Sequence, residues 1–363
     1  METQNIYDLN FDSLKNFLID KANVKESQSK MRAQQILSAV YKQNIKNFDE
    51  LTTFSLELRE KIKNLISLEK PKAVEIQKST DGTIKFLLSL KDKRNVETVL
   101  IPDRLKNRYT ICVSVSVACA LSCNFCATGQ IPKRYFRNLS PGEIVSQIVL
   151  CKEYLNDFNS SKFIKGVVVM GQGSAFFNLS STKIAIDIMK HKNALDFGRT
   201  RITVSTVGLN SKKDNKSAIE WAAENINTYI AWSLHSSLEK QRAEIMPVSK
   251  KHPIKSLIPL FKTYYQKTKL PIFIEYIALE DNLSELHAKE LIKIMKQVPS
   301  KLNLIEFNPL ANKEFKAASK DKIEKFSKLI QDNGFLALLR KSKGRDINGS
   351  CGSLANSRSI TNG

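Results

Sequence analysis

The chain has 363 residues, of which 57 are Lys or Arg and 36 are Asp or Glu, so its formal net charge is +21 at pH 7. This length suits one barrel-sized domain with a small additional domain. The positive charge favours a polyanionic partner such as nucleic acid, although a lysine-rich surface can also serve solubility alone. Six cysteines are too few for a disulfide scaffold. Because neither a signal peptide nor an apolar stretch of about 18 residues is visible, we expect a cytoplasmic protein without membrane association.

Residues 1–78 are predicted to form a helical domain, because apolar side chains recur at helical spacing as far as about residue 70. Examples are Leu14, Phe17 and Leu18 in one stretch, and Val40 and Tyr41 in the next. Residues 79–108 are predicted to form a β-hairpin linker, with strands at 83–90 and 96–101 around a polar turn.

Residues 109–340 alternate between strand and helix patterns, which predicts an α/β fold with a parallel sheet curled into a partial (β/α)6 barrel. The active site of such a barrel lies at the carboxyl ends of its strands. Residues 341–363 are predicted to form a C-terminal loop and a mobile tail. The expected strands are 111–117, 164–170, 202–205, 229–234, 272–277 and 302–307, and the clearest expected helices are 141–154, 254–266 and 285–296.

Three cysteines form a C-x3-C-x2-C motif at Cys119, Cys123 and Cys126. Each iron of a cubic four-iron cluster takes one external ligand, so three thiolates leave one iron open to a small molecule. This spacing indicates a 4Fe–4S cluster and is typical of radical S-adenosylmethionine (SAM) enzymes. Two alternatives stay open at this point: three buried thiols, or a zinc site completed by His235 or another distant residue.

Two further cysteines are candidate site residues. Cys112 alternates onto the same strand face as Ser114 and Ser116, which are small and polar, and its strand leads into the cysteine motif. Cys351 follows a run of basic residues, which predicts a lowered pKa of its thiol, although an incidental surface cysteine is equally compatible. Cys151 is interpreted as structural.

Small and polar residues gather where the predicted strands end, which indicates a pocket at one rim of the barrel. The glycines after the second strand would let the backbone approach a ligand closely. The candidate pocket residues are Gly173, Ser174, Ser205, Ser233, Leu234, His235 and Asn308.

Over nearly its whole length the chain resembles the RlmN/Cfr family of radical SAM RNA methyltransferases. Residues 31–37 are similar to part of the family's RNA-contacting helical domain, and Cys112 precedes Cys119 by seven residues, as the family's second catalytic cysteine does. The resembling segments are 31–37, 96–99, 126–129, 137–139, 205–206, 233–235, 246–247, 308–309 and 344–347.

The resemblance implies a mechanism in which Cys351 is first methylated by one SAM molecule. The cluster on the three motif cysteines then reduces a second SAM, and the resulting radical takes hydrogen from the methyl group on Cys351. The methylene radical adds to an adenine to form a protein–RNA thioether, and Cys112 releases the product by forming a disulfide with Cys351. Glu97 matches the family's proton acceptor. The positions that match SAM contacts are Gly173, Ser205, Ser233, Leu234, His235 and Asn308.

The chain departs from the resemblance at Ser174, where the family has a glutamate that binds the SAM amino group. Loss of a charge-assisted hydrogen bond costs about 1.5–3 kcal/mol, or roughly ten- to a hundredfold in affinity. The expected product is 2-methyladenine in 23S rRNA, with tRNA as a further candidate, and phosphate contacts should make RNA binding sensitive to salt. An electron donor such as flavodoxin or ferredoxin and a monomeric state are also expected.

Three alternative functions stay open. One is C8 methylation of the same rRNA adenine, as in the Cfr branch. Another is a degenerate relative that binds RNA without methylating it, which Ser174 favours and the five retained cysteines oppose. The last is a radical SAM enzyme with a small-molecule substrate, which the basic N-terminal helices oppose.

Overall fold

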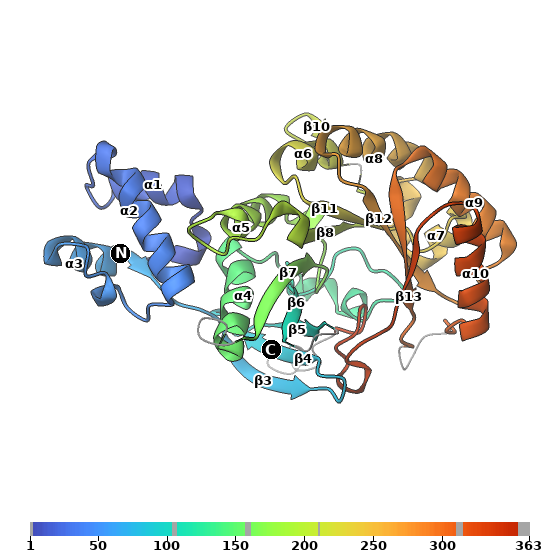
Figure 1. The fold of residues 1–363 in the computed structure, drawn as a ribbon, viewed down its shortest axis with the longest axis horizontal. Helices are drawn as coiled ribbons and strands as arrows, with labels where there is room; N and C mark the ends of the chain where they lie inside the picture. Colours follow the sequence, from blue (N-terminus) through green and yellow to red (C-terminus); the bar gives the residue numbers. More distant parts are fainter. Residues whose placement is uncertain (1–2, 104–106, 157–160, 210, 310–314, 355–363) are drawn as a thin grey trace.

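The computed structural model describes residues 3–103, 107–156, 161–209, 211–309 and 315–354 (Figure 1). The part of the tail from residue 355 onwards, which was predicted to be mobile, lies outside these ranges. No helix within them is long and apolar enough to cross a membrane.

A small helical unit forms the N-terminus, as its apolar spacing predicted. Its helix α1 begins after Asn10, whose side chain accepts a hydrogen bond from Ser13 N, and it buries Leu14 and Leu18. The chain then returns so that two short strands pair in parallel. The unit contains β1 (Gln4–Asn5), α1 (Phe11–Asp20), α2 (Glu26–Ser38), α3 (Leu56–Leu65) and β2 (Ile66–Ser67).

A ten-stranded sheet forms the rest of the framework, in the order β14-β13-β12-β11-β8-β7-β6-β5-β4-β3. The strands from β6 to β14 pair in parallel, and β5, β4 and β3 extend the sheet with antiparallel pairing. The antiparallel strands are β3 (Lys72–Lys78), β4 (Ile84–Ser89) and β5 (Asn95–Pro102). The parallel strands are β6 (Arg108–Cys112), β7 (Phe163–Val169), β8 (Ile202–Thr206), β11 (Tyr229–Ser233), β12 (Ile272–Ala278), β13 (Ser300–Glu306) and β14 (Ala337–Arg340). A separate two-stranded ribbon joins β9 (Lys212–Lys213) and β10 (Lys216–Ser217).

Helices cover the outer face of the parallel strands and leave the inner face to the core and the site (Figure 1). The first of them, α4, begins where Ser140 and Glu143 form a capping box and Pro141 takes the first position. The outer helices are α4 (Pro141–Leu155), α5 (Leu179–Lys190), α6 (Ala218–Asn225), α7 (Glu239–Ile245), α8 (Ile254–Thr268), α9 (Glu285–Gln297) and α10 (Lys320–Asp332). The predicted partial barrel is confirmed.

Three details of the sheet differ from the sequence expectation. The strand predicted at 111–117 ends at Cys112, because the amides of Val115 and Ser116 both bond to Gln172 O, beyond the end of β7. Strand β14 was not predicted, since its outer residues are exposed and do not alternate in polarity. Strand β3 was missed for the same reason, because its residues are mostly exposed at the opposite edge of the sheet.

The N-terminal unit packs on α4 and α5, at the side of the barrel (Figure 1). Asp8 Oδ1 accepts a hydrogen bond of 2.6 Å from Gly142 N, and Asn10 Nδ2 donates to Asp187 Oδ2 at 2.9 Å. Glu153 on α4 lies 2.6 Å from the ammonium groups of both Lys46 and Lys70. These polar contacts fix the unit beside the first barrel helices.

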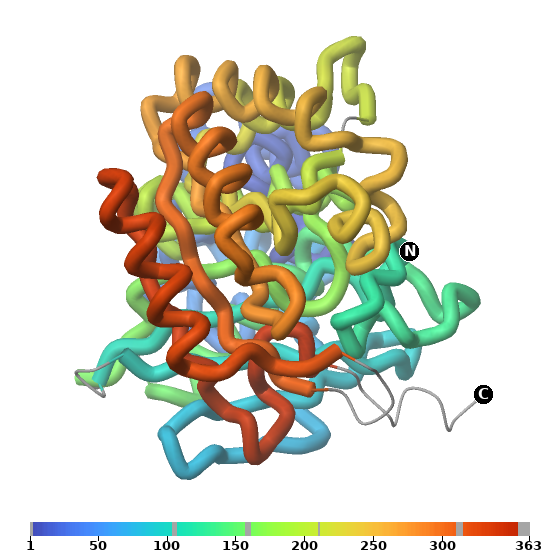
Figure 2. Tube along the Cα trace, turned by 90° about the vertical axis from the view of Figure 1, so that its right-hand side faces the viewer, coloured from blue at the N-terminus to red at the C-terminus, as the bar shows by residue number. Residues whose placement is uncertain are grey.

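The segment that follows β14 returns to the antiparallel strands β3, β4 and β5, at the turn that joins β3 to β4. Gly344 N donates to Asp81 Oδ2 at 2.8 Å, and Thr80 N donates to Asp346 Oδ2 at 3.2 Å. Figure 2 shows this red segment beside the light-blue turn of the hairpin. Gly344 has a φ of +67°, and a Cβ there would lie 2.8 Å from Thr83 Cγ2, so this close approach requires glycine.

Candidate active site

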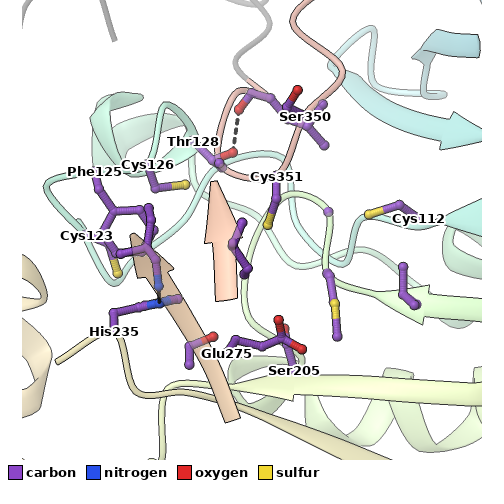
Figure 3. A pocket seen from close by; sticks show the side chains of 18 of the residues that line it. Cys112, Cys123, Phe125, Cys126, Thr128, Ser205, His235, Glu275, Ser350 and Cys351 are labelled. Atoms are coloured by element: carbon purple, nitrogen blue, oxygen red, sulfur yellow. Dashed lines mark hydrogen bonds between the residues drawn. The ribbon is translucent and has the colours of Figure 1, made fainter. Parts of the chain in front are cut away.

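A cavity of about 360 Å³ opens at the carboxyl ends of the parallel strands (Figure 3). Its wall combines the loop after β6, the ends of β7, β8, β11 and β12, and the segment after β14. The sequence-predicted site residues that line it are Cys112, Cys119, Cys123, Cys126, Gly173, Ser174, Ser205, Ser233, His235 and Cys351.

Backbone hydrogen bonds hold the second half of the cysteine motif. Cys126 N bonds to Cys123 O at 3.2 Å, and Asn124 N reaches Ile245 O at 2.9 Å. The described residues contain no group of three or more His, Cys, Asp or Glu side chains gathered for a single metal ion. A cubic cluster requires a different arrangement of ligands. Each cysteine bonds a different iron, so the three sulfurs need not converge on one point. Three free thiols lining one cavity fit such a cluster.

Burial raises the pKa of all three motif thiols, that of Cys119 to about 11. Mutual repulsion adds to burial for Cys123, since Cys126 and Cys119 lie close to it. An iron ligand must be a thiolate, so the charge of the iron has to offset this cost when the cluster assembles. The arrangement therefore favours protonated thiols until the metal arrives.

His235 faces the cysteine loop from the end of β11. Its ring meets the Phe125 ring edge-on at a centroid distance of 4.7 Å, and its Nδ1 accepts a hydrogen bond of 3.2 Å from Ile277 N. Burial lowers the pKa of His235 to about 3, so the imidazole is neutral near pH 7. With Nδ1 as acceptor, the proton sits on Nε2, where it can be donated to a ligand.

The loop after β7 brings its backbone unusually close to the cysteine loop. Gly173 has a φ of +92°, and a Cβ at this position would lie 1.9 Å from Ser116 Oγ. Ser174 follows, and its buried hydroxyl finds no hydrogen-bond partner among the described residues. This close approach is to Ser116, so the approach of the glycine to a ligand stays a prediction, and Ser174 leaves a neutral polar group on the cavity wall.

Cys112 and Cys351 line the cavity as free thiols, so the expected disulfide is not formed in the structure. Cys351 lies between Cys126 and Cys112 in Figure 3. Burial and the charge of Cys351 raise the pKa of Cys112 to about 12. Cys351 is exposed toward the open cavity, yet the protein around it and the carboxylate of Glu275 raise its pKa to about 11.

The pKa of Cys351 corrects the sequence expectation, which was a lowered value. Of the preceding basic residues, only Arg340 acts to lower this pKa, and burial outweighs it. Two other basic residues of the run bond elsewhere: Lys343 Nζ donates to Pro102 O at 2.7 Å, and Arg345 pairs with Glu306 at 2.7 Å. A run of lysines and arginines in the sequence does not predict which of these side chains point toward the thiol, and therefore does not predict their effect on its pKa.

Glu97, Leu234 and Asn308 do not line this cavity. Glu97 is buried on β5 and pairs with Lys85 at 3.1 Å, while burial raises the pKa of its carboxyl group. Leu234 is fully buried, and Asn308 lies in a neighbouring hollow of about 240 Å³ and donates to Ser342 Oγ at 2.9 Å. Glu97 does share a strand face with Val99, which lines the cavity, so it borders the site.

Sequence reasoning missed four charged residues of the cavity wall: Glu275 on β12, Arg340 on β14, and Lys341 and Lys343 after it. Glu275 interrupts an otherwise apolar strand, and a carboxylate inside a buried strand is itself a signal of a functional position. Arg340 gave no comparable signal, because its strand had not been predicted.

Comparisons with known proteins agree with this geometry. Residues 4–68 match the family described as ribosomal RNA large subunit methyltransferase N-terminal domain. The dual-specificity RNA methyltransferase RlmN of Lawsonia intracellularis is 40% identical over 328 residues, which cover 89% of each chain. The chain belongs to the RlmN family. The RlmN of Buchnera aphidicola is 37% identical over 359 residues, or 96% of this chain and 95% of the relative.

The barrel of this RlmN-family chain is a radical SAM fold. The whole chain, with the barrel and the N-terminal unit, superposes on the crystal structure of a radical SAM methyltransferase from Sphaerobacter thermophilus. The TM-score is 0.85 and the sequence identity is 30%, over 96% of this chain and 98% of that one. Radical SAM enzymes bind a 4Fe–4S cluster and SAM, and the motif cysteines of this RlmN-family member lie where its cavity can receive both.

Proposed function

We propose that the protein is a radical SAM methyltransferase that forms 2-methyladenine in 23S rRNA, with tRNA as a second substrate. One observation carries the proposal: Cys351, from the C-terminal loop, lies in the same cavity as Cys112 and the three motif cysteines. A methyl-carrying cysteine needs this position to be reached first by the methyl donor and then by the radical source. The relatives' names, dual-specificity RNA methyltransferases, support RNA as the substrate.

Cys119, Cys123 and Cys126 would hold one 4Fe–4S cluster with an open fourth iron. When bound, the cluster supplies one electron for the reductive cleavage of SAM. Gly173, Ser205, Ser233 and His235 would line the SAM site, and Leu234 and Asn308 would support it from beside the cavity. Two SAM molecules are consumed per turnover, one as methyl donor and one as radical source.

Cys351 carries the methyl group. Its sulfur attacks the SAM methyl carbon as the sulfonium–methyl bond breaks, and the thiol proton leaves. Since this thiol has a pKa of about 11, its deprotonation is a costly part of the step near pH 7. Transfer of one hydrogen atom from the resulting S-methyl group to the deoxyadenosyl radical of the second SAM would leave a methylene radical on Cys351, which would add to C2 of the adenine.

Cys112 releases the product. The unpaired electron of the RNA adduct would first pass back to the cluster. The Cys112 thiolate then attacks the Cys351 sulfur, and the S–S bond forms as the bond between that sulfur and the RNA-linked carbon breaks; the released carbon keeps the bonding pair and takes up a proton to become the methyl group. Glu97 receives the proton lost from adenine C2, in keeping with its raised pKa and its place beside the cavity. The disulfide is reduced again before the next turnover, and flavodoxin or ferredoxin supplies electrons to the cluster.

RNA binds mainly through its phosphates, for which the net charge of +21 provides the counterpart. The proposed division is a helical RNA-contacting domain at 1–78, a hairpin linker at 79–108, the barrel at 109–340 and the cysteine loop with its tail at 341–363. Residues 80, 81, 344 and 346 join the linker to the cysteine loop directly. The enzyme acts as a monomer in the cytoplasm.

The test is an anaerobic reaction of the cluster-reconstituted protein with methyl-deuterated SAM and transcripts of 23S rRNA and tRNA, followed by nucleoside mass spectrometry. We expect deuterated 2-methyladenosine from the wild type and from Cys151→Ala, whose thiol is buried in α4 away from the cavity, and none from Cys351→Ala. Formation of 8-methyladenosine instead would place the protein in the Cfr branch.

Ser174 favours one second candidate, a relative that binds RNA and a cluster but does not methylate. It is distinguished in the same experiment, because it predicts RNA binding and cluster absorbance without SAM cleavage. Cleavage of SAM without RNA binding would point to a small-molecule substrate.

A further inference from the structure

Glu275 lies on the cavity wall, below Cys351 and beside Ser205 in Figure 3. On β12 it pairs in register with Ser233 of β11 and Asn303 of β13, so it lies in the middle of the parallel sheet. Its backbone oxygen accepts hydrogen bonds from the amides of Leu234 and His235, at 3.1 and 3.2 Å. The backbone of Glu275 therefore takes part in the hydrogen bonds of the sheet, while its side chain lines the cavity.

The Glu275 carboxylate uses only one of its oxygens. Oε1 accepts a hydrogen bond of 2.8 Å from Asn303 Nδ2, whereas Oε2 is buried and has no partner among the described residues. The residue is 4% exposed. A buried carboxylate oxygen without a donor is unfavourable by several kcal/mol in general, so native proteins rarely keep one unless a ligand or water completes it.

Arg340 lies next to the Glu275 carboxylate but does not donate a hydrogen bond to its free oxygen. Its Nη1 is 3.8 Å from Glu275 Oε1, which is beyond hydrogen-bond distance and on the oxygen that Asn303 already occupies. The Arg340 side chain is 46% exposed and also lines the cavity. The two side chains therefore present a free carboxylate oxygen and a free guanidinium edge, side by side, to one ligand.

Glu275 and Arg340 are complementary to the amino group and the carboxylate of an amino acid. An amino group donates N–H bonds to a carboxylate, and a guanidinium binds a carboxylate with paired N–H donors. A sulfonium has no N–H to offer to Oε2. Glu275 is the single carboxylate among the described residues that line the cavity, and Ser174, which also lines it, is neutral. A cationic amino group entering the cavity therefore meets its charge complement only at Glu275.

We propose that Glu275 and Arg340 bind the amino-acid end of SAM, with Glu275 accepting from its amino group and Arg340 donating to its carboxylate. The inference rests on the SAM binding of the proposed function and names the residues that provide it in this chain. It also accounts for how a cavity with a serine at position 174 keeps an acidic partner for the cofactor, supplied from β12 rather than from the loop after β7.

The test compares the dissociation constants of three ligands for the cluster-reconstituted protein, by anaerobic equilibrium dialysis. SAM and S-adenosylhomocysteine carry the amino-acid end, whereas 5′-methylthioadenosine lacks it. Glu275→Gln keeps the shape of the side chain but removes its charge. We expect this variant to bind SAM and S-adenosylhomocysteine at least about tenfold more weakly and methylthioadenosine unchanged. Arg340→Gln should show the same selectivity.

Glu280→Gln is the matched control, because Glu280 pairs with Lys322 outside the cavity and its loss should leave all three affinities unchanged. Cluster absorbance and the thermal midpoint report on folding. If Glu275→Gln does not fold, Arg340→Gln decides the question, since its half-exposed side chain contributes little to the core.

Equal weakening of all three ligands would overturn the assignment to the amino-acid end, and unchanged SAM binding would overturn the proposal while the methyltransferase function stands. Failure of the wild type itself to bind SAM would overturn both.

Discussion

The thiols of Cys112 and Cys351 line the same cavity, and the charge of Cys351 contributes to the raised pKa of Cys112. One thiol ends the first barrel strand and the other lies on a loop beyond the last strand. Their meeting requires the whole parallel sheet to curl and the C-terminal segment to return across its open side.

Replacing Cys112 with Ala should trap the reaction on Cys351. Without the thiol that attacks Cys351, a thioether to RNA should persist on protein purified anaerobically from cells. Peptide mass spectrometry of the tryptic fragment containing Cys351 measures this directly. A nucleotide adduct or an S-methyl group would show that SAM binds despite Ser174, whereas an unmodified Cys351 in protein with a full cluster would contradict the methyltransferase proposal.

The six cysteines should divide into two groups when each is changed to Ala. We expect loss of cluster iron and of its visible absorbance for Cys119, Cys123 and Cys126, because each supplies one iron with its external ligand. Cys112→Ala, Cys351→Ala and Cys151→Ala should keep near wild-type iron content. Iron and sulfide analysis after anaerobic reconstitution gives the result, and retention of the cluster by Cys123→Ala would be incompatible with this ligand set.

Asp81→Ala should loosen the loop that carries Cys351. It removes the acceptor of the 2.8 Å bond from Gly344 N, and loss of one such bond is worth about 1–2 kcal/mol, or roughly 5- to 30-fold in local opening. Hydrogen exchange of residues 344–352 should speed up accordingly, and methylation of Cys351 should decrease. Asp332→Ala, at the exposed end of α10, is the control that should change neither.

Gly173→Ala should destabilise the protein more than Gly334→Ala does. Both glycines have left-handed backbone, with φ of +92° and +82°, so both variants lose about 1–2 kcal/mol to backbone strain. A Cβ at position 334 meets nothing within 4 Å, whereas at 173 it collides with Ser116 Oγ, which adds about 1–3 kcal/mol. Urea unfolding measures the difference, and equal losses would show that the contact with Ser116 relaxes freely.

His235 should make stability fall as the pH drops. Burial lowers its folded-state pKa to about 3, against about 6.5 in the unfolded chain, so the unfolded state binds the extra proton between these values. Its contribution is complete above about pH 6.5 and decreases toward pH 3, by about 1.4 kcal/mol per pH unit. His235→Asn suits the left-handed φ of +60° and lacks this proton, so its urea-derived stability should depend less on pH below 6.5. Parallel curves for the two proteins would refute this.

Local patterns predicted much of the framework correctly. The apolar spacing of α8 and α9 and the alternating strand and helix segments are properties of neighbouring residues, so they can be read from the chain. The edge strands β3 and β14 could not be read in this way, because exposed strands carry no apolar alternation and depend on a partner strand for their hydrogen bonds.

The order of residues is enough to specify which chemistry is possible. It contains the spacing of Cys119, Cys123 and Cys126, the extra thiols of Cys112 and Cys351, and the serine at position 174. Which charges act on those groups depends on how the chain folds. The fold has two effects on these charges. It turned Lys343 and Arg345 of the basic run before Cys351 toward other partners, and it placed Glu275 and Arg340 side by side on the cavity wall. The reason is that residue order fixes reactivity by type, whereas burial and electrostatic fields depend on residues that are distant in sequence and meet only on folding.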